Sequence, residues 1–436
     1  MRPNHFLTVL FFICVLAYSS LSQNVSQWRG PNREGIYPES NLMKSWPENG
    51  PGLLWSTEEI GAGFSSPVIA GDKLLVNGEI NRVAHVFAFD LNGKLLWKYA
   101  NGPEFFGEGY SANFPGARST PTVFDGLVYV CSGMGRIACL DAFSGKELWA
   151  VNMVTDLGGT INMFGYSESL LVDETKVYCY PGGKESNIVA LDRLTGKPVW
   201  TSKALGDPVS FSSPMMIRLP ERSIVRKIRN IEIGTMEDKL TKYPELNIFV
   251  TVSHGYLLGV DAKTGELLWS HKEDSVKLEG EHCNTPIYAD GSIYSISGDE
   301  NGNGAFKLQL SDDGKSIKEV WRNGNVRNAL GGFVKIGDRL YSSSEDKKLK
   351  VLDTQTGQIT EILSGMKGNL ISADNMLICY TDNGYVNLIK GVGSKLEVAG
   401  KFKITKGEKE HFAHPAIANG VLYVRHGNAL MAYQIK

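Results

Sequence analysis

The side chains best suited to contact a ligand lie in long segments between short apolar stretches: Arg118, Tyr110, Tyr166, Glu168, His282 and His414. A guanidinium such as Arg118 offers two parallel N–H groups to a carboxylate or a phosphate. Beside it, a tyrosine and a histidine could move a proton on an acidic sugar. Alternatively, Arg118 pairs with Glu168 or with loop carbonyls and only locks neighbouring elements together.

Histidines suggest a second chemistry, that of a bound metal ion. His282, His411 and His414 precede apolar stretches, with Glu281 and Glu410 beside them in the chain. Two imidazoles and a carboxylate are a common zinc set. No local spacing fixes that geometry here, so we expect hydrogen-bonded loop histidines and no metal site. The sequence also lacks a glycine-rich phosphate loop and a G-x-S-x-G nucleophile elbow.

A repeated sequence motif, here called the repeated phrase, predicts the elements that must position these residues. Its clearest copies are residues 141–149, 192–200 and 261–269. In its first clear copy, Asp141 can accept turn amides, Gly145 suits a positive φ, and Trp149 falls in the next strand. Tryptophans at the corresponding position of other units are Trp55, Trp97, Trp200, Trp269 and Trp321. Such self-similarity is typical of stacked supersecondary units.

Each unit carries four short alternating strands separated by glycine-containing turns, which is the pattern of propeller blades. We predict an all-β, eight-bladed β-propeller of four-stranded antiparallel blades, with seven blades as the alternative. The predicted blades cover about 64–99, 119–152, 167–202, 211–271, 284–322, 331–364, 368–404, and 413–436 together with 52–58. Long loops on one face of such a ring, above its channel, are where a ligand site is expected.

The two ends of the chain are predicted to share a blade. The last unit stops after three strands at Lys436, whereas residues 52–58 carry Trp55 in an outer-strand context with no strands before it. An N-terminal strand that completes the last blade removes two open sheet edges.

The first 22 residues read as a secretory signal peptide, with a basic start and an apolar run too short to span a membrane. We therefore expect a periplasmic or extracellular protein, with lipid attachment at Cys14 less favoured. The balance of 45 basic and 47 acidic residues gives no field that would attract nucleic acid. Cys131 and Cys139 could bond across a hairpin, but small core residues are the preferred interpretation.

Residues 218–245 form an insertion between the first two strands of the fourth predicted blade. Its candidate partner-binding residues are Arg222, Arg226, Lys227 and Arg229. The isoleucine spacing does not separate a helix from a hairpin, and a solvated excursion remains an alternative to a docking element.

The repeated phrase resembles the pyrroloquinoline quinone-like (PQQ-like) β-propeller repeat, from residue 27 to residue 436. Three stretches outside the repeat resemble one secreted bacterial subfamily: residues 28–35, 116–123 and 165–183. Two better-understood relatives share this propeller. The quinoprotein dehydrogenases bind the quinone and calcium over the ring axis, and the propeller lipoprotein of the outer-membrane β-barrel assembly machinery binds proteins without a cofactor. This chain lacks the adjacent-cysteine disulfide of the former and a convincing lipid-attachment motif of the latter.

These observations favour an exported, monomeric binding scaffold that recognises a protein or a glycan through its loop face, without catalysis and without a cofactor. A PQQ-dependent dehydrogenase with calcium is one alternative, and a uronate-directed lyase is another.

Overall fold

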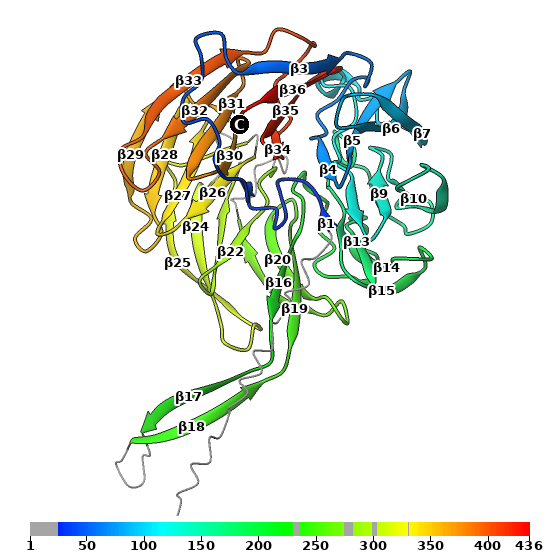
Figure 1. The fold of residues 1–436 in the computed structure, drawn as a ribbon. Helices are drawn as coiled ribbons and strands as arrows, with labels where there is room; N and C mark the ends of the chain where they lie inside the picture. The colour runs from blue at the N-terminus through cyan, green and yellow to red at the C-terminus, as the bar shows by residue number, and fades with distance from the viewer. Residues whose placement is uncertain (1–24, 230–235, 274–281, 299–302, 330) are drawn as a thin grey trace, which may run out of the picture.

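The computed structural model describes residues 25–229, 236–273, 282–298, 303–329 and 331–436; between 226 and 238 only the backbone of two strands is described. The predicted signal peptide lies outside these residues. Eight blades, each built from four antiparallel strands, stand around a central axis (Figure 1), which confirms the eight-bladed propeller and excludes the seven-bladed alternative. In this part of the chain the one helical element is a short 3₁₀ turn, η1 (Gly109–Asn113).

Blades are numbered in chain order, and their strands run from the innermost outward. The first four blades contain β4 (Val68–Ala70), β5 (Lys73–Ile80), β6 (Val83–Asp90) and β7 (Leu95–Pro103); β8 (Thr122–Phe124), β9 (Leu127–Cys131), β10 (Arg136–Asp141) and β11 (Glu147–Asn152); β12 (Leu171–Val172), β13 (Lys176–Cys179), β14 (Ile188–Asp192) and β15 (Pro198–Ser202); β16 (Met215–Leu219), β19 (Leu246–Val252), β20 (Tyr256–Asp261) and β21 (Leu267–Lys272).

The other four contain β22 (Ile287–Ala289), β23 (Ser292–Ile296), β24 (Ala305–Leu310) and β25 (Ile317–Asn323); β26 (Phe333–Ile336), β27 (Arg339–Ser344), β28 (Lys348–Asp353) and β29 (Ile359–Ser364); β30 (Gly368–Ala373), β31 (Met376–Thr381), β32 (Tyr385–Lys390) and β33 (Glu397–Lys403); β34 (Ala416–Ala418), β35 (Val421–His426), β36 (Ala429–Gln434) and β3 (Gly52–Thr57).

The ring closes where the sequence predicted. Strand β3, from the N-terminal part of the chain, pairs antiparallel with β36, and Trp55 lies opposite Ala432. Blade eight is thereby completed, and the outer edge of β36 is covered.

The repeated tryptophans join each blade to the next. The Trp149 indole donates from Nε1 to the carbonyl of Arg193, 3.0 Å away in the following blade. A Cβ added to Gly196, at φ +70°, would lie 2.5 Å from that indole. The glycine of the phrase therefore serves the turn and also leaves room for the neighbouring ring. Trp55, Trp97, Trp200, Trp269 and Trp321 make the same kind of bond to a turn carbonyl of the next blade.

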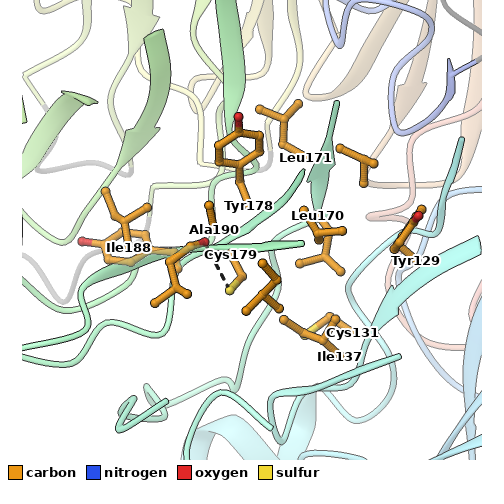
Figure 2. Packing of buried hydrophobic residues seen from close by; sticks show 14 of the residues in the cluster. Tyr129, Cys131, Ile137, Leu170, Leu171, Tyr178, Cys179, Ile188 and Ala190 are labelled. Atoms are coloured by element: carbon orange, nitrogen blue, oxygen red, sulfur yellow. Dashed lines mark hydrogen bonds between the residues drawn. The ribbon is translucent and has the colours of Figure 1, made fainter. Parts of the chain in front are cut away.

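Apolar side chains fill the spaces between the sheets. Figure 2 shows residues of blade two, such as Tyr129 and Ile137, meeting residues of blade three, such as Leu171 and Tyr178. Cys131 and Cys139 lie in this cluster as free thiols, as expected for small core residues.

The N-terminal segment enters the channel and crosses the middle of the ring (Figure 1). Its first strand, β1 (Val25–Ser26), adds to the inner edge of blade two, and its second, β2 (Ile36–Tyr37), adds in parallel to β30 of blade seven. Between them, Arg33 donates to the carbonyls of Ser169, Leu170 and Pro214 in blades three and four.

Arg29 takes the other side of the channel, where it donates to the carbonyls of Phe333 and Leu370 in blades six and seven. Both arginines are 1% exposed. Residues 25–37, which we call the channel plug, therefore tie opposite sides of the ring together.

Small hydroxyls around the channel link neighbouring blades. The His414 amide donates to Ser66 Oγ at 3.0 Å, and the Ser66 amide donates to Thr120 Oγ1 at 3.0 Å. The Thr120 amide then donates to Ser169 Oγ, and the Ser169 amide to Ser213 Oγ. These bonds hold the starts of the inner strands in register, which places their side chains around one axis.

The insertion in blade four forms a hairpin, β17 (Arg222–Arg229) paired with β18 (Met236–Tyr243), which extends away from the ring (Figure 1). This settles the helix-or-hairpin question. Val225 and Leu240, opposite each other on the two strands, are 60% and 56% exposed. Arg222 contacts the ring by donating to the carbonyl of Asp312.

Candidate functional site

A pocket of about 280 Å³ opens on the loop face, over the axis of the ring. Its walls come from the loops that precede the inner strands of seven blades, and its floor comes from the channel plug. The lining residues are Trp28, Phe64, Tyr110, Phe114, Arg118, Phe164, Ser167, Ser169, Phe211, Ser213, Cys283, Ala329, Phe412 and His414.

Aromatic rings make most of the wall, and they contact one another in sequence around it. Phe64 lies 5.3 Å from Phe412, and Phe412 stacks on Phe114 with ring centroids 6.3 Å apart. Phe164 then bridges Phe114 and Phe211, at 6.1 and 5.5 Å. Each ring is held by tilted, edge-on or stacked contacts with its neighbours, so the wall is already formed without a ligand.

Tyr110 marks the rim. It belongs to η1 in the long loop between blades one and two, and its ring meets Phe114 and Phe164 edge-on. With 64% of its surface exposed, it is the open aromatic edge of the wall.

Trp28 forms the floor. Its ring meets the buried His414 ring edge-on, with centroids 5.1 Å apart, and the Arg29 guanidinium lies 5.5 Å from the indole. Burial, followed by the positive charge of Arg29, holds the pKa of His414 well below its usual value, so this imidazole is neutral at pH 7. The channel plug closes the channel beneath Trp28, so the pocket is closed at its lower end.

Arg118 is the charged group of the wall. Its guanidinium lies between Phe64 and Phe164, 5.6 and 5.7 Å from their centroids, and it donates to the carbonyls of Phe114 and Gly116. Burial lowers the pKa of Arg118 and the Glu104 carboxyl opposes that shift, yet an arginine stays protonated at neutral pH.

Two buried carboxyls support the loops around the pocket. Glu104 Oε1 accepts the amides of Phe105 and Gly133, and Glu168 Oε1 accepts the amide of Tyr180. Burial raises the pKa of both Glu104 and Glu168 to about 7, although these amides favour the ionised form. Each carboxyl joins the loop before one blade to a strand end or turn within that blade.

The six predicted ligand residues separate into two groups. Arg118, Tyr110 and His414 line the pocket, whereas Tyr166, Glu168 and His282 are buried outside it. Tyr166 donates its hydroxyl proton to the Pro181 carbonyl.

His282 and Glu168 fill structural positions. The His282 ring lies 3.3 Å from the Glu273 carboxylate and 3.2 Å from the His254 carbonyl. Arg118 bonds to carbonyls of its own loop, and Glu168 is committed to Tyr180, so the predicted Arg118–Glu168 pair is absent from the described contacts.

The histidines considered as possible metal ligands also have other partners. His411 has the Tyr380 hydroxyl 2.5 Å from Nδ1 and stacks on the His426 ring at 3.7 Å. Within the described residues, no group of three or more histidine, cysteine, aspartate or glutamate side chains could hold a metal ion.

The aromatic wall was missed as a unit because its rings come from loops before the inner strands of five different blades. A usable signal was present: the sequence Phe-Ser-Ser-Pro occurs at residues 64–67 and again at 211–214, each time at the start of an inner strand. The serines of this signal supply the interblade bonds, and its phenylalanines face the pocket. Trp28 carried no repeat signal.

A family model described as outer membrane protein assembly factor BamB matches residues 82–360. The chain belongs to this family. BamB from Salmonella typhimurium is 21% identical over 300 residues, which cover 62% of this chain and 73% of the relative. The quinohemoprotein alcohol dehydrogenase ADH IIB of Pseudomonas putida is 25% identical over 161 residues, which cover 36% of this chain and 20% of the dehydrogenase.

Solved structures agree on the propeller. BamB from Moraxella catarrhalis superposes with a TM-score of 0.59 at 14% identity and covers 88% of this chain and 98% of its own. A europium-containing methanol dehydrogenase superposes with a TM-score of 0.52 at 14% identity, covering 92% of this chain and 90% of its own. These likenesses establish the PQQ-like fold, which BamB-type and dehydrogenase-type proteins share. The described residues contain no helix long and apolar enough to cross a membrane.

Proposed function

We propose that this protein is an exported, non-catalytic scaffold that binds a partner protein by holding one of its apolar residues in the aromatic pocket. The observation that carries the proposal is the convergence of five phenylalanines and Trp28 on one blind pocket at the ring axis. Interface hot spots are apolar or aromatic anchors that fill such preformed pockets. The BamB membership supports it, since that family's description names an assembly factor of the outer membrane.

The wall favours a protein partner over a glycan. Sugar recognition needs several polar groups that bond to hydroxyls. The described lining is mostly aromatic carbon, and its polar side chains are those of Arg118, Tyr110, His414, Cys283 and three serines. Two of those serines, Ser169 and Ser213, already accept interblade amides. Of the residues considered for a lyase, Arg118, Tyr110 and His414 line the pocket, whereas Tyr166 is buried outside it. The lyase alternative is weaker because the mostly aromatic lining offers few further groups to hold a sugar.

A quinone with calcium fits this lining poorly. Calcium takes six to eight oxygen ligands, mainly carboxylates and carbonyls. Among the described lining residues the side-chain oxygens are those of Tyr110 and three serines, and none belongs to a carboxylate. We therefore derive no redox step for this site.

Site-specific photocrosslinking in the producing bacterium tests the proposal. A benzophenone amino acid at Tyr110, on the pocket rim, should form an adduct with a partner protein. The same group at Phe143, which is 84% exposed in the turn between β10 and β11 on the opposite face, is the matched control and should form none. Adding Phe164→Ala to the Tyr110 variant should abolish the adduct, because the anchor loses its wall. Equal adducts from both positions, or none from Tyr110, would count against the pocket as the binding site.

A further inference from the structure

The Arg118 guanidinium, the charged group of the pocket, has fewer hydrogen-bond acceptors than it has donors. A guanidinium carries five N–H donors in a planar fork. Two of the Arg118 donors bond to Gly116 and Phe114, and its other three have no acceptor among the described residues. Arg118 is partly exposed and lines the pocket, so these donors are open to an occupant.

The protein itself does not neutralise this charge inside the pocket. No carboxylate is among the described lining residues, and Glu104, the acidic group that acts on Arg118, turns one oxygen to the amides of Phe105 and Gly133. A half-buried cation between two aromatic rings lacks much of its hydration, so an anion with good hydrogen-bond geometry binds there more strongly than at an exposed arginine.

The remaining walls require the rest of the occupant to be apolar and short. Phe114, Phe164 and Phe211 leave a carbon-lined space of about 280 Å³, below the usual size of a drug-like ligand site. Trp28 closes the floor, so an extended chain cannot pass through the channel. A chain end can enter such a pocket, and its terminal carboxylate is an anion that every protein carries.

We propose that the pocket binds the C-terminal residue of the partner, with an aromatic or branched aliphatic side chain against the phenylalanines and the free α-carboxylate on Arg118. This inference rests on the proposed function, because it names which part of a partner the pocket receives. An internal apolar residue would leave the three Arg118 donors unpaired, which is why the terminus is favoured over an internal loop.

The test uses the full mature protein and hexapeptides that end in phenylalanine, with binding followed by calorimetry and by intrinsic tryptophan fluorescence, to which Trp28 contributes. We expect the free-acid peptide to bind at least about tenfold more tightly than the same peptide with a C-terminal amide, since charge-assisted bonds to the carboxylate are lost. Replacing the last residue with serine should also weaken binding. In the variant Arg118→Met the free acid and the amide should bind equally.

The possible outcomes distinguish failure of the terminal-carboxylate inference from failure of the proposed partner-binding function. Equal binding of acid and amide by the unaltered protein, both lost in Phe164→Ala, would overturn the terminal-carboxylate assignment while leaving the aromatic pocket as a partner site. Failure of every peptide to bind would count against both. Tight binding of free 3-phenylpropionate, equal to that of the peptide, would show that the site serves small acids and would overturn a protein terminus as its occupant.

Discussion

Glu104 shows how one buried group can make the stability of the whole propeller depend on pH. Its folded pKa is about 7, and its ordinary value is 4.5, because burial disfavours the carboxylate. The folded state therefore binds the proton more tightly than the unfolded state between these values. The free energy of unfolding must fall as the pH rises through that window.

The variant Glu104→Gln should remove this loss. Glutamine keeps an oxygen to accept the amides of Phe105 and Gly133 and cannot ionise. We expect the variant and the wild type to be equally stable at pH 4.5, and the variant to be more stable by about 3 kcal/mol at pH 8, from a pKa difference of about 2.5.

Urea unfolding at both pH values measures this difference. The exposed Glu59→Gln is the control and should leave the pH dependence unchanged. Glu168 has a similar shift, but it is present in each protein and cancels in the comparison. Parallel pH profiles for Glu104→Gln and the wild type would contradict the assignment.

At the scale of single residues, sequence reasoning found part of the site. Arg118 and Tyr110 stood out because they occupy long glycine-rich loops, and both line the pocket. Tyr166 stood out for the same reason and is buried. The type and position of a loop residue do not say which way its side chain turns, since that depends on carbonyls and carboxylates from other blades.

At the scale of elements, the sequence predicts the contacts that form between neighbouring copies of the repeat better than those that form outside it. Trp149 and Gly196 belong to neighbouring copies of one phrase, so their contact could be expected from the repeat. The hairpin β17–β18 could not be separated from a helix, because apolar residues at both spacings occur in the insertion and no repeat constrains it. The channel plug was missed altogether, since Arg29 and Arg33 bond to backbone carbonyls, which carry no sequence signature.

The hairpin should be dispensable for the ring. Leu219 and Leu246 are paired where β16 and β19 leave the blade, so an Asn-Gly turn can replace residues 220–245. We expect the free energy of unfolding to change by less than about 1 kcal/mol, because the hairpin forms a sheet of its own and its described side chains are largely exposed.

Chemical denaturation of the shortened protein checks this expectation. Peptide binding at the loop face should also be unchanged, which serves as an internal control that the pocket is intact. A loss of several kcal/mol would mean that the insertion supports blade four.

At the scale of the whole molecule, two features of the N-terminal segment have separable roles. Strand β3 closes the ring, and the channel plug ties its opposite sides and floors the pocket. Deleting residues 23–40 should leave a closed, monomeric ring of lower stability that no longer binds at the pocket, because Trp28 is gone.

Deleting residues 23–58 should have a different result. It removes β3 as well and uncovers the edge of β36, so we expect association between molecules and loss of a single cooperative unfolding transition. Sedimentation velocity and urea unfolding distinguish the two deletions. Identical behaviour of both proteins would contradict a closing role for β3.

The position of Trp28 determines when, during folding, the pocket becomes able to bind a ligand. The carbonyls that hold its neighbour Arg29 belong to Phe333 and Leu370, which follow it by 304 and 341 residues. The indole cannot be seated until blades six and seven exist and have come round to meet the start of the chain. A partly folded propeller therefore lacks the floor of the pocket. Binding of a ligand in the pocket shows that all the blades have folded and that the ring has closed.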